Sequence, residues 1–408
     1  MSGVVIVGGG QAAASLATQL RTLGHAGPVT LFCEEPHPPY QRPPLSKAYL
    51  LGNLEREQLF LKREAWYDQE KIDLHLGTRV DAIDRDAHCI RFGDDSLAYD
   101  HLILATGSLP RRLPEAIGGG LDGVHTLRDL TDIDALAPQM QPGRRLVIVG
   151  GGYIGLEAAA VARKLGLDVT LIEAAPRILQ RVASPETAEY IRKLHISHGV
   201  KILQGMSLER LLDQKGWVNG VLLFNGDVLA ADLVIVGIGI VPATSLAEKA
   251  GLAIDNGIAV DEYGRTSDPA IWAAGDCASF PTTAGRIRLE SVGNAIDQAK
   301  CIAANIAGTP TPYVPKPWFW SDQYDVKLQI AGLNTGYDHV VTCPGNNDAR
   351  SFWYLCGERL LAVDAANDPG AYMAGKRIIE AGKTISPEHL TDTSKSPKDL
   401  LTMATDPN

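Results

Sequence analysis

The stretch LVIVGGGYIGLEAAAVARKLGLDVTLIE, residues 146–173, encodes a strand, a turn, a helix and a second strand in succession. Residues 146–149 are a continuous apolar run that predicts a buried parallel strand, and residues 158–165 predict a helix. The glycines between them have G-x-G-x-x-G spacing: Gly150, Gly152 and Gly155. In such a loop the first glycine allows a tight turn, the second admits a pyrophosphate, and the third lets helix and strand pack closely. The stretch therefore predicts a dinucleotide site at a helix N-terminus.

Glu173 ends the second strand of this stretch, residues 169–172. A carboxylate at that position can accept hydrogen bonds from both ribose hydroxyls of a dinucleotide, whereas it would repel a 2′-phosphate. The sequence therefore favours NADH over NADPH at this site.

Residues 4–34 repeat the same pattern. An apolar VVIV run precedes Gly8, Gly10 and Ala13 at G-x-G-x-x-A spacing, and a helix over 14–23 and a VTLF strand lead to Glu34. Two such units most simply hold two dinucleotides, one of them a permanently bound flavin. The fold class expected is α/β, with two Rossmann-like dinucleotide-binding domains and a C-terminal α+β domain.

The length of 408 residues suggests two or three domains. Acidic residues outnumber basic ones by 48 to 38, which argues against nucleic acid as the main partner. Because no secretion signal and no apolar run of roughly 20 residues is visible, we expect a cytoplasmic protein without a membrane partner. The six cysteines are scattered, without C-x-x-C spacing, which predicts buried free thiols, no metal site and no redox-active disulfide.

The rest of the chain divides by composition. The four prolines of residues 37–47 predict a rigid loop without a helix before Leu45. The expected domains are an FAD-binding domain over 1–113 and 243–317, an NADH-binding domain over 114–242, and a C-terminal domain over 318–408. Further expected elements are strands at 77–83, 89–92, 98–105, 200–203, 222–224, 271–276, 326–331, 351–355 and 360–363, a helix at 370–381, and a mobile last dozen residues.

Four motifs together carry a family resemblance: RPPLSK at 42–47, GGGYIGLE at 150–157, LESVGNA at 289–295 and PWFWSDQYD at 317–325. With them the chain resembles the FAD-dependent NADH:ferredoxin reductases of bacterial oxygenase systems, the group of putidaredoxin reductase and biphenyl dioxygenase ferredoxin reductase. The resemblance covers essentially the whole chain and implies a glutathione-reductase-like fold. It also implies FAD and NADH as cofactors and a 2Fe-2S ferredoxin partner, which feeds a haem-thiolate monooxygenase or a Rieske dioxygenase.

The resemblance also implies cofactor contacts. For FAD, Ala12 and Glu34 would hold the pyrophosphate and ribose, Val80 the adenine, Asp276 the ribityl chain and Val292 the flavin ring. Arg128 would lie near the cofactor phosphates or the isoalloxazine edge. The remaining FAD candidates are Gly8, Gly10, Ala13, Arg42, Lys47, Ala105, Thr106, Gly107 and Glu290. The NADH candidates are Gly150, Gly152, Tyr153, Ile154, Gly155, Glu157, Glu173 and Gly237.

Three residues are the candidates for the chemistry. Lys47 is expected close to the flavin, where an ammonium would stabilise the negative charge of the reduced ring; the alternative is a solvated surface lysine. Glu157 is expected to pair with Lys47 or to touch the nicotinamide carboxamide, against the alternative of a helix-end charge. Trp320 has packing as its first role and is a candidate for covering the ring and shortening the electron path.

Two other functions stay open at this point. An NADH oxidase or disulfide reductase would need a cysteine near the flavin, and the loop QRPPLSK contains none. A flavin- and NADH-binding signalling protein like apoptosis-inducing factor shares both nucleotide folds but carries a long targeting extension and insertions. Both alternatives therefore rank below the ferredoxin reductase.

Overall fold

The computed structural model describes residues 3–283, 285–345, 349–392 and 394–406. The chain divides into two units, each assembled from segments that are distant in the sequence. The first unit comprises Met1–Arg42, Leu54–Leu109 and Ile240–Pro317. The second comprises Pro43–Asn53, Pro110–Gly239 and Trp318–Asn408.

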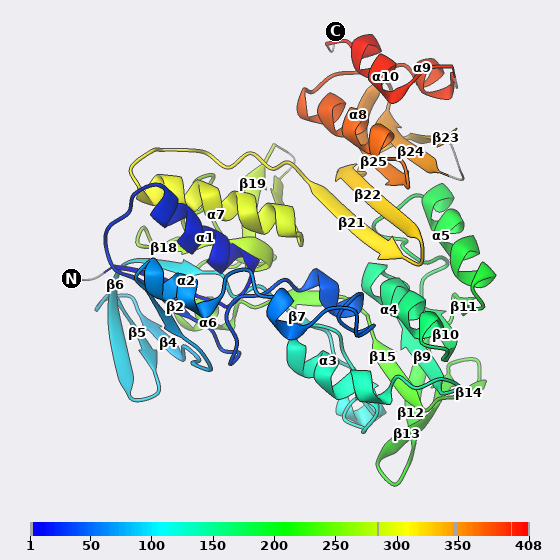
Figure 1. Ribbon diagram of the computed structural model, residues 1–408, viewed down its shortest axis with the longest axis horizontal. Helices are drawn as coiled ribbons and strands as arrows, with labels where there is room; N and C mark the ends of the chain where they lie inside the picture. The colour runs from blue at the N-terminus through cyan, green and yellow to red at the C-terminus, as the bar shows by residue number, and fades with distance from the viewer. Residues whose placement is uncertain (1–2, 284, 346–348, 393, 407–408) are drawn as a thin grey trace. The chain divides into compact units, whose positions relative to one another are not determined.

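A mixed sheet forms the centre of the first unit, in the order β3-β2-β1-β6-β5-β4, with β18 paired to β6. Strands β3, β2, β1, β6 and β18 run parallel, whereas β4 and β5 are antiparallel additions. The strand bounds are β1 Gly3–Val7, β2 Val29–Phe32, β3 Ile72–His75, β4 Ala82–Asp84, β5 Cys89–Phe92, β6 Asp95–Leu104 and β18 Ile271–Ala273. Helices α1 (Gln11–Thr22) and α7 (Val292–Ile306) lie side by side against this sheet (Figure 1).

Smaller elements complete the first unit. They are α2 Glu64–Gln69, α6 Ser245–Lys249, β7 Ser108–Pro110, β16 Ile240–Pro242, β17 Ile258–Ala259, β19 Ala278–Thr282, β20 Gly285–Ile287, and the 3-10 turns η2 Arg56–Gln58 and η5 Gly275–Cys277.

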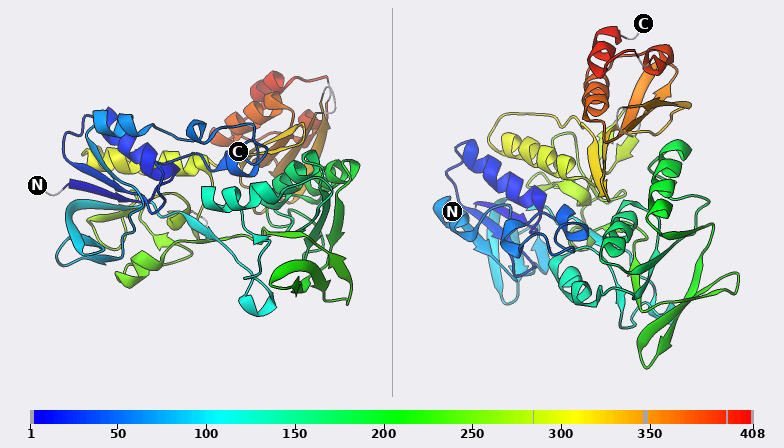
Figure 2. Two further views of the ribbon diagram at one scale, coloured as in Figure 1. Left: turned by 60° about the horizontal axis from the view of Figure 1, so that its bottom comes forward. Right: turned by 45° about the vertical axis from the view of Figure 1, so that its right-hand side comes forward.

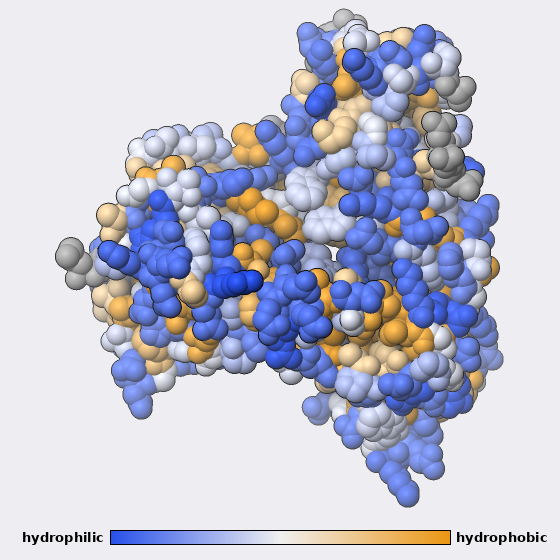
Figure 3. Space-filling model, in the orientation of Figure 1, coloured by the Kyte–Doolittle hydropathy of each residue, from blue (hydrophilic) through white to orange (hydrophobic). Residues whose placement is uncertain are grey.

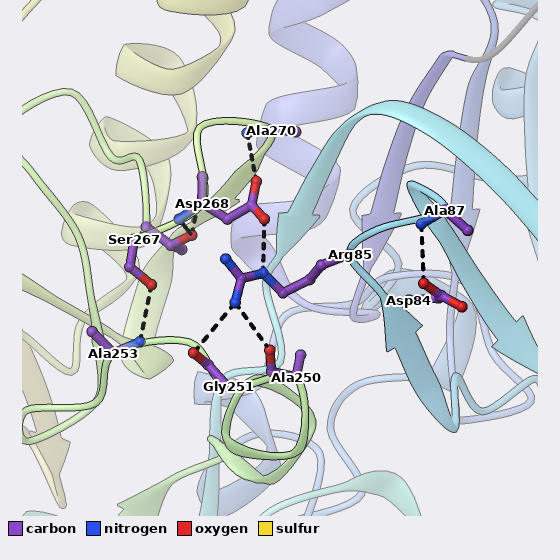
Figure 4. Close-up of polar contacts among 10 residues, drawn as sticks. Asp84, Arg85, Ala87, Ala250, Gly251, Ala253, Ser267, Asp268 and Ala270 are labelled. Atoms are coloured by element: carbon purple, nitrogen blue, oxygen red, sulfur yellow. Dashed lines mark hydrogen bonds and ion pairs between the residues drawn. The ribbon is translucent and has the colours of Figure 1, made fainter.

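An arginine clamp ties the β4–β5 hairpin to the segment that returns before β18 (Figure 4). Arg85 Nε donates to Asp268 Oδ2 at 2.8 Å, and its Nη1 reaches the carbonyls of Ala250 and Gly251. The other oxygen of Asp268 accepts the backbone N–H of Ala270 at 3.0 Å. Because Asp268 is buried, these bonds replace the water that its charge has lost.

A parallel sheet in the order β11-β10-β9-β15-β8 forms the centre of residues 110–239 of the second unit. Its strands are β8 Val124–His125, β9 Arg145–Val149, β10 Asp168–Glu173, β11 Lys201–Gln204 and β15 Leu233–Val236. The helices are α3 Leu130–Leu136, α4 Tyr153–Lys164 and α5 Pro185–Ser197, with 3-10 turns η1 Pro43–Ser46, η3 Glu115–Ile117 and η4 Ala137–Gln139. A small antiparallel sheet is added by β12 Leu208–Gln214, β13 Trp217–Leu223 and β14 Val228–Ala230.

The C-terminal part of the second unit is an antiparallel sheet in the order β21-β22-β25-β24-β23. The strands are β21 Trp318–Gln323, β22 Val326–Gly332, β23 His339–Pro344, β24 Arg350–Cys356 and β25 Arg359–Ala366. Helix α8 (Pro369–Glu380) packs on one face of this sheet, and α9 (Pro387–Thr391) and α10 (Pro397–Met403) follow it (Figure 2, right).

Several sequence expectations were wrong in detail. Residues 77–81 are not a strand, because Gly77 adopts a positive φ of 61°, and the strands on either side are β3 and β4. The proline loop turns already at Pro43, since the fixed φ of proline suits a first helical turn. Helix α10 lies within the tail expected to be mobile, and a reciprocal bond between Ser396 and Asp399 caps it.

Strands β12 and β23 were also missed, because neither shows a clean alternation of apolar and polar residues. Cys33, Cys277 and Cys301 are buried, as predicted. Cys356 was also expected to be buried, but it is the last residue of β24 and is exposed.

Within the described ranges, no helix combines the length and the apolar character that crossing a bilayer requires. On the face drawn in Figure 3, hydrophilic residues cover most of the surface, and hydrophobic residues form smaller groups between them.

Candidate functional site: two glycine loops and a buried lysine–glutamate pair

The first glycine loop connects β1 to α1. Gly8 has a φ of +133°, and a Cβ there would lie 2.1 Å from the carbonyl oxygen of Ala105, so the turn requires glycine. Ala13 is fully buried in the first turn of α1, and Ala12 is 6% exposed. The loop therefore brings the N-terminus of α1 directly to the carboxyl end of β1.

Gly10, unlike Gly8, is not required by the backbone conformation of the loop. Its backbone is extended, with φ −114° and ψ −166°, which any residue can adopt. A Cβ on Gly10 would meet no described atom within 4 Å. Neither the backbone nor the packing of the described chain requires glycine at this position, whereas a pyrophosphate lying against the loop would. The loop thus fits a dinucleotide.

The other FAD candidates of the first unit lie around this loop and the end of β6. Glu34 follows β2, is largely exposed, and has Arg79 3.3 Å away. Val80 is buried. Arg42 forms an ion pair with Glu35 at 2.5 Å and a 3.1 Å hydrogen bond to the Tyr40 hydroxyl. Arg42 thus has partners within the chain, and its role toward a cofactor stays a prediction.

Beyond β6 lie the remaining FAD candidates, most of which are half-buried. Ala105 is buried, the Thr106 hydroxyl donates to the Ala243 carbonyl at 2.7 Å, and Gly107 has a φ of +70°. Asp276 accepts the Ser108 hydroxyl at 2.9 Å, which fixes its carboxylate. Arg288 holds Glu290 at 2.5 Å, and Val292 is the first residue of α7, whose Ser291 caps it. The backbone N–H groups at this helix start suit a polar ring edge.

The second glycine loop, between β9 and α4, has the same design. A Cβ on Gly150 would lie 2.3 Å from the carbonyl oxygen of Gly237, and one on Gly155 2.3 Å from that of Gly150. Gly152 again has an extended backbone, with φ −80° and ψ 176°. A Cβ on it would meet no described atom within 4 Å. Ile154 is 40% exposed beside it. This loop too fits a dinucleotide that approaches the backbone.

Glu173 reaches back to this loop from the end of β10. Its Oε2 accepts the backbone N–H of Gly151 at 2.7 Å, and its Oε1 accepts that of Ala175 at 2.7 Å. The two bonds fix the carboxylate at the loop, and each oxygen keeps a lone pair for a ribose hydroxyl.

The predicted pairing of Lys47 with Glu157 is present. Lys47 Nζ lies 2.8 Å from Glu157 Oε2, and the side chains are 15% and 3% exposed. The Ser46 hydroxyl donates to the same oxygen at 2.7 Å. Glu157 is on α4, and Lys47 follows η1, so the proline turn delivers the ammonium to the helix. A surface position for this lysine is thereby ruled out by its burial and its partner.

Aromatic side chains surround the start of β21. Trp318 and Trp320 stack with ring centroids 5.6 Å apart, and Phe319, on the opposite face of the strand, packs on Tyr153 at 5.1 Å. Burial raises the pKa of the Tyr153 hydroxyl, and this hydroxyl has no partner among the described atoms. Trp320 is half-buried, and packing accounts for its position. Arg128 is half-buried before α3, and its backbone N–H donates to Asp132.

Four residues around Glu157 escaped the sequence reading: Ser46, Ser321, Gln323 and His195. The Ser321 hydroxyl donates to Glu157 Oε1 at 2.7 Å, and Gln323 and His195 extend this network. A signal was available for two of them, because Ser321 and Gln323 alternate along β21 and so share its buried face.

His195 gives the stability of the protein a pH dependence. Burial lowers its pKa to about 4, whereas in the unfolded chain it titrates near 6.5. The unfolded state therefore gains a proton first as the pH falls, so this stabilisation is complete above pH 6.5 and is lost toward pH 4. The total loss is about 3 kcal/mol.

Urea denaturation at pH 7.5 and pH 5 measures this effect as the difference between the wild type and His195→Gln. The difference is needed because Asp364 also titrates: burial raises its pKa to about 6. Its contribution to the stability of the protein has the opposite pH dependence and is lost as the pH rises through 6. Equal pH dependence of the two proteins would contradict a neutral, buried His195.

The cysteines near the first loop are unsuited to redox catalysis. Burial raises the pKa of Cys33 to about 12 and also raises that of Cys277. A protonated thiol is a poor nucleophile. In the described parts of the chain, no group of histidines, cysteines and carboxylates could hold a metal ion.

Two dinucleotide loops of this design, with a buried lysine–glutamate pair, define a flavin- and nicotinamide-linked oxidoreductase. Residues 2–299 match the model of the pyridine nucleotide-disulphide oxidoreductases, and residues 318–401 match that of the reductase C-terminal domain. The chain belongs to this family and, within it, to the FAD-dependent ferredoxin–NAD(P)+ reductases.

Individual relatives match along nearly their whole length. Rhodocoxin reductase of Rhodococcus erythropolis is 46% identical over 394 residues, which span 96% of this chain and 92% of that protein. Putidaredoxin reductase of Pseudomonas putida is 42% identical over 411 residues, spanning 98% and 97%. The solved structure of a covalent putidaredoxin reductase–putidaredoxin complex superposes with a TM-score of 0.95 at 41% identity, over 99% of both chains. The fold class is thereby confirmed.

Proposed function

We propose that this protein takes a hydride from NADH onto FAD and passes single electrons to a 2Fe-2S ferredoxin, which feeds a terminal oxygenase. FAD, when bound, accepts an electron pair and releases its electrons one at a time, which joins a two-electron donor to a one-electron acceptor. The observation that carries the proposal is the pair of open glycine positions, Gly10 and Gly152, one in each unit. Relatives that serve putidaredoxin and dioxygenase systems support the ferredoxin acceptor. We also propose that the protein acts in the cytoplasm.

The residues of this chain bind and orient the reactants. The first loop, with Ala12 and Glu34, holds FAD, and the second, with Glu173, holds NADH. Lys47 would supply a positive charge beside the flavin, where it would favour the more negative, reduced form of the ring. Glu157 keeps this ammonium in place at 2.8 Å and receives the carboxamide of the nicotinamide. Trp320 packs within the aromatic group of β21 and would in addition cover the flavin ring.

Glu173 is expected to set the choice between NADH and NADPH. Changing Glu173→Gln removes the charge that repels a 2′-phosphate while keeping one acceptor for the ribose. The ratio of kcat/KM for NADH to that for NADPH should fall about tenfold, which corresponds to about 1.4 kcal/mol. Steady-state rates with both nucleotides measure this ratio, and Glu186→Gln, an exposed carboxylate on α5, is the matched control. An unchanged ratio would remove Glu173 from the recognition of the ribose.

A ferredoxin-coupled assay tests the function. NADH-dependent reduction of cytochrome c should be slow with the protein alone and should rise when a 2Fe-2S ferredoxin is added. A panel of ferredoxins from monooxygenase and dioxygenase systems identifies the partner. Rapid peroxide or water formation from oxygen, unaffected by ferredoxin, would instead support an NADH oxidase.

A further inference from the structure

A chain of buried hydrogen bonds runs from Glu157 into the C-terminal sheet. The Ser321 hydroxyl lies 2.7 Å from Glu157 Oε1, and the Gln323 amide nitrogen lies 3.1 Å from the Ser321 oxygen. The Gln323 amide oxygen is 2.8 Å from His195 Nε2, and the Tyr324 hydroxyl is 3.2 Å from His195 Nδ1. Glu157, Ser321, Gln323 and His195 are at most 3% exposed.

The donors and acceptors of these hydrogen bonds can be arranged in only one way. Glu157 accepts from the single hydroxyl hydrogen of Ser321, so the Ser321 oxygen must accept from the Gln323 NH₂ group. The Gln323 carbonyl then faces His195 and needs a donor, which fixes the proton of the neutral imidazole on Nε2. His195 Nδ1 is left to accept from Tyr324. Each donor thus points toward Glu157.

The charges around the two ends are defined. Lys47 forms an ion pair with Glu157, and the carboxylate also acts electrostatically on the buried Tyr153 hydroxyl. His198 and Tyr324 face His195, and Tyr324 stacks on His198 with centroids 3.7 Å apart. Lys47 is the cation paired with Glu157, and the hydrogen bond from Ser321 holds the other oxygen of the same carboxylate.

We infer that Ser321, Gln323 and His195 are positioning residues that orient Glu157 for hydride transfer from NADH. Ser46 and Lys47 occupy Oε2 of the carboxylate, and the Ser321 bond fixes Oε1, so the rotation of the carboxylate is determined from both sides. The C-terminal domain would thereby influence the reduction of the flavin by NADH, in addition to its part in the fold. This inference rests on the proposed role of Glu157.

The test is a double-mutant cycle read out by anaerobic stopped-flow reduction of the flavin by NADH. Ser321→Ala should lower the limiting rate about tenfold, as expected for a lost hydrogen bond to a charged group, with little change in the NADH concentration for half-saturation. In a Glu157→Gln background the same change should have no further effect, because it acts through the carboxylate. Gln323→Leu, which leaves Ser321 without its donor, provides a second route to the same result.

Ser351→Ala is the matched control. Ser351 is a buried serine of the same sheet, on β24, and its hydroxyl accepts from Trp353 at 3.0 Å, away from Glu157. NADH should reduce the flavin of this variant at the wild-type rate. Equal slowing by Ser321→Ala in both backgrounds would overturn the inference and leave Ser321 with a structural role. If Glu157→Gln alone left the rate unchanged, the proposed role of Glu157 would fail first. If Glu157→Gln slowed reduction and neither Ser321→Ala nor Gln323→Leu did, only the inference would fail.

Discussion

Changing Gly152→Val is expected to give a folded, yellow protein whose kcat/KM for NADH is lower by about 100-fold or more, about 2.7 kcal/mol. The extended backbone of Gly152 tolerates a side chain, and a Cβ would meet no described atom within 4 Å. The free protein therefore has no reason to unfold. The added methyl groups would instead occupy the space into which the NADH pyrophosphate must come.

Flavin absorbance, thermal unfolding and NADH kinetics together measure this outcome. Gly120→Val is the matched control, since Gly120 lies on the surface of the same unit and a Cβ there would make an ordinary contact at 3.6 Å with Glu115. The control should behave as wild type in all three measurements. Normal NADH kinetics in Gly152→Val would show that the nucleotide does not cross this loop.

Gly10→Val is the counterpart in the first unit, and it should yield a folded but colourless protein. Its backbone is likewise extended, and a Cβ would likewise meet no described atom. Loss of the space for the FAD pyrophosphate should weaken FAD binding by about 100-fold or more, about 2.7 kcal/mol. Because every later electron transfer needs the flavin, ferredoxin reduction should disappear with the colour.

The two valine variants serve as controls for each other. Flavin content after purification, and after incubation with excess FAD, measures the first loop, and reduction by NADH measures the second. If Gly10→Val retained its flavin while Gly152→Val lost it, the assignment of the two loops would be reversed. Gly8 is unsuitable for such a test, because its positive φ and the 2.1 Å approach to Ala105 make any replacement a folding defect.

The fold was largely predictable because its two glycine-loop stretches, residues 4–34 and 146–173, are each local in sequence. The loops at Gly8 and Gly150 each lie between an apolar strand and a helix, and each stretch supplies one pair of parallel strands, β1 with β2 and β9 with β10. Strands such as β3 and β12 were missed since their charged, partly exposed residues give weak periodicity. The tail was expected to be mobile, and the contact of Leu400 with the C-terminal core that anchors α10 is a tertiary feature.

The candidate site was predictable only in part. Family motifs indicated Lys47 and Glu157, and the structure brings them to 2.8 Å. Ser321, Gln323 and His195 were missed because Ser321 is 164 residues from Glu157 and Gln323 is 128 residues from His195, so their partners are seen only in the folded chain. Polar residues alternating within an aromatic strand are the local sign of such a buried network.

Double-mixing stopped-flow spectroscopy under anaerobic conditions tests whether the reduced flavin passes its electrons to a ferredoxin. The oxidised protein is first mixed with NADH until the flavin absorbance has bleached, and a 2Fe-2S ferredoxin is added in the second mix. We expect the flavin absorbance to return as the ferredoxin becomes reduced, with two ferredoxins reduced for each NADH oxidised. A flavin that stays reduced with every ferredoxin in the panel, and returns only when oxygen is admitted, would contradict this electron transfer.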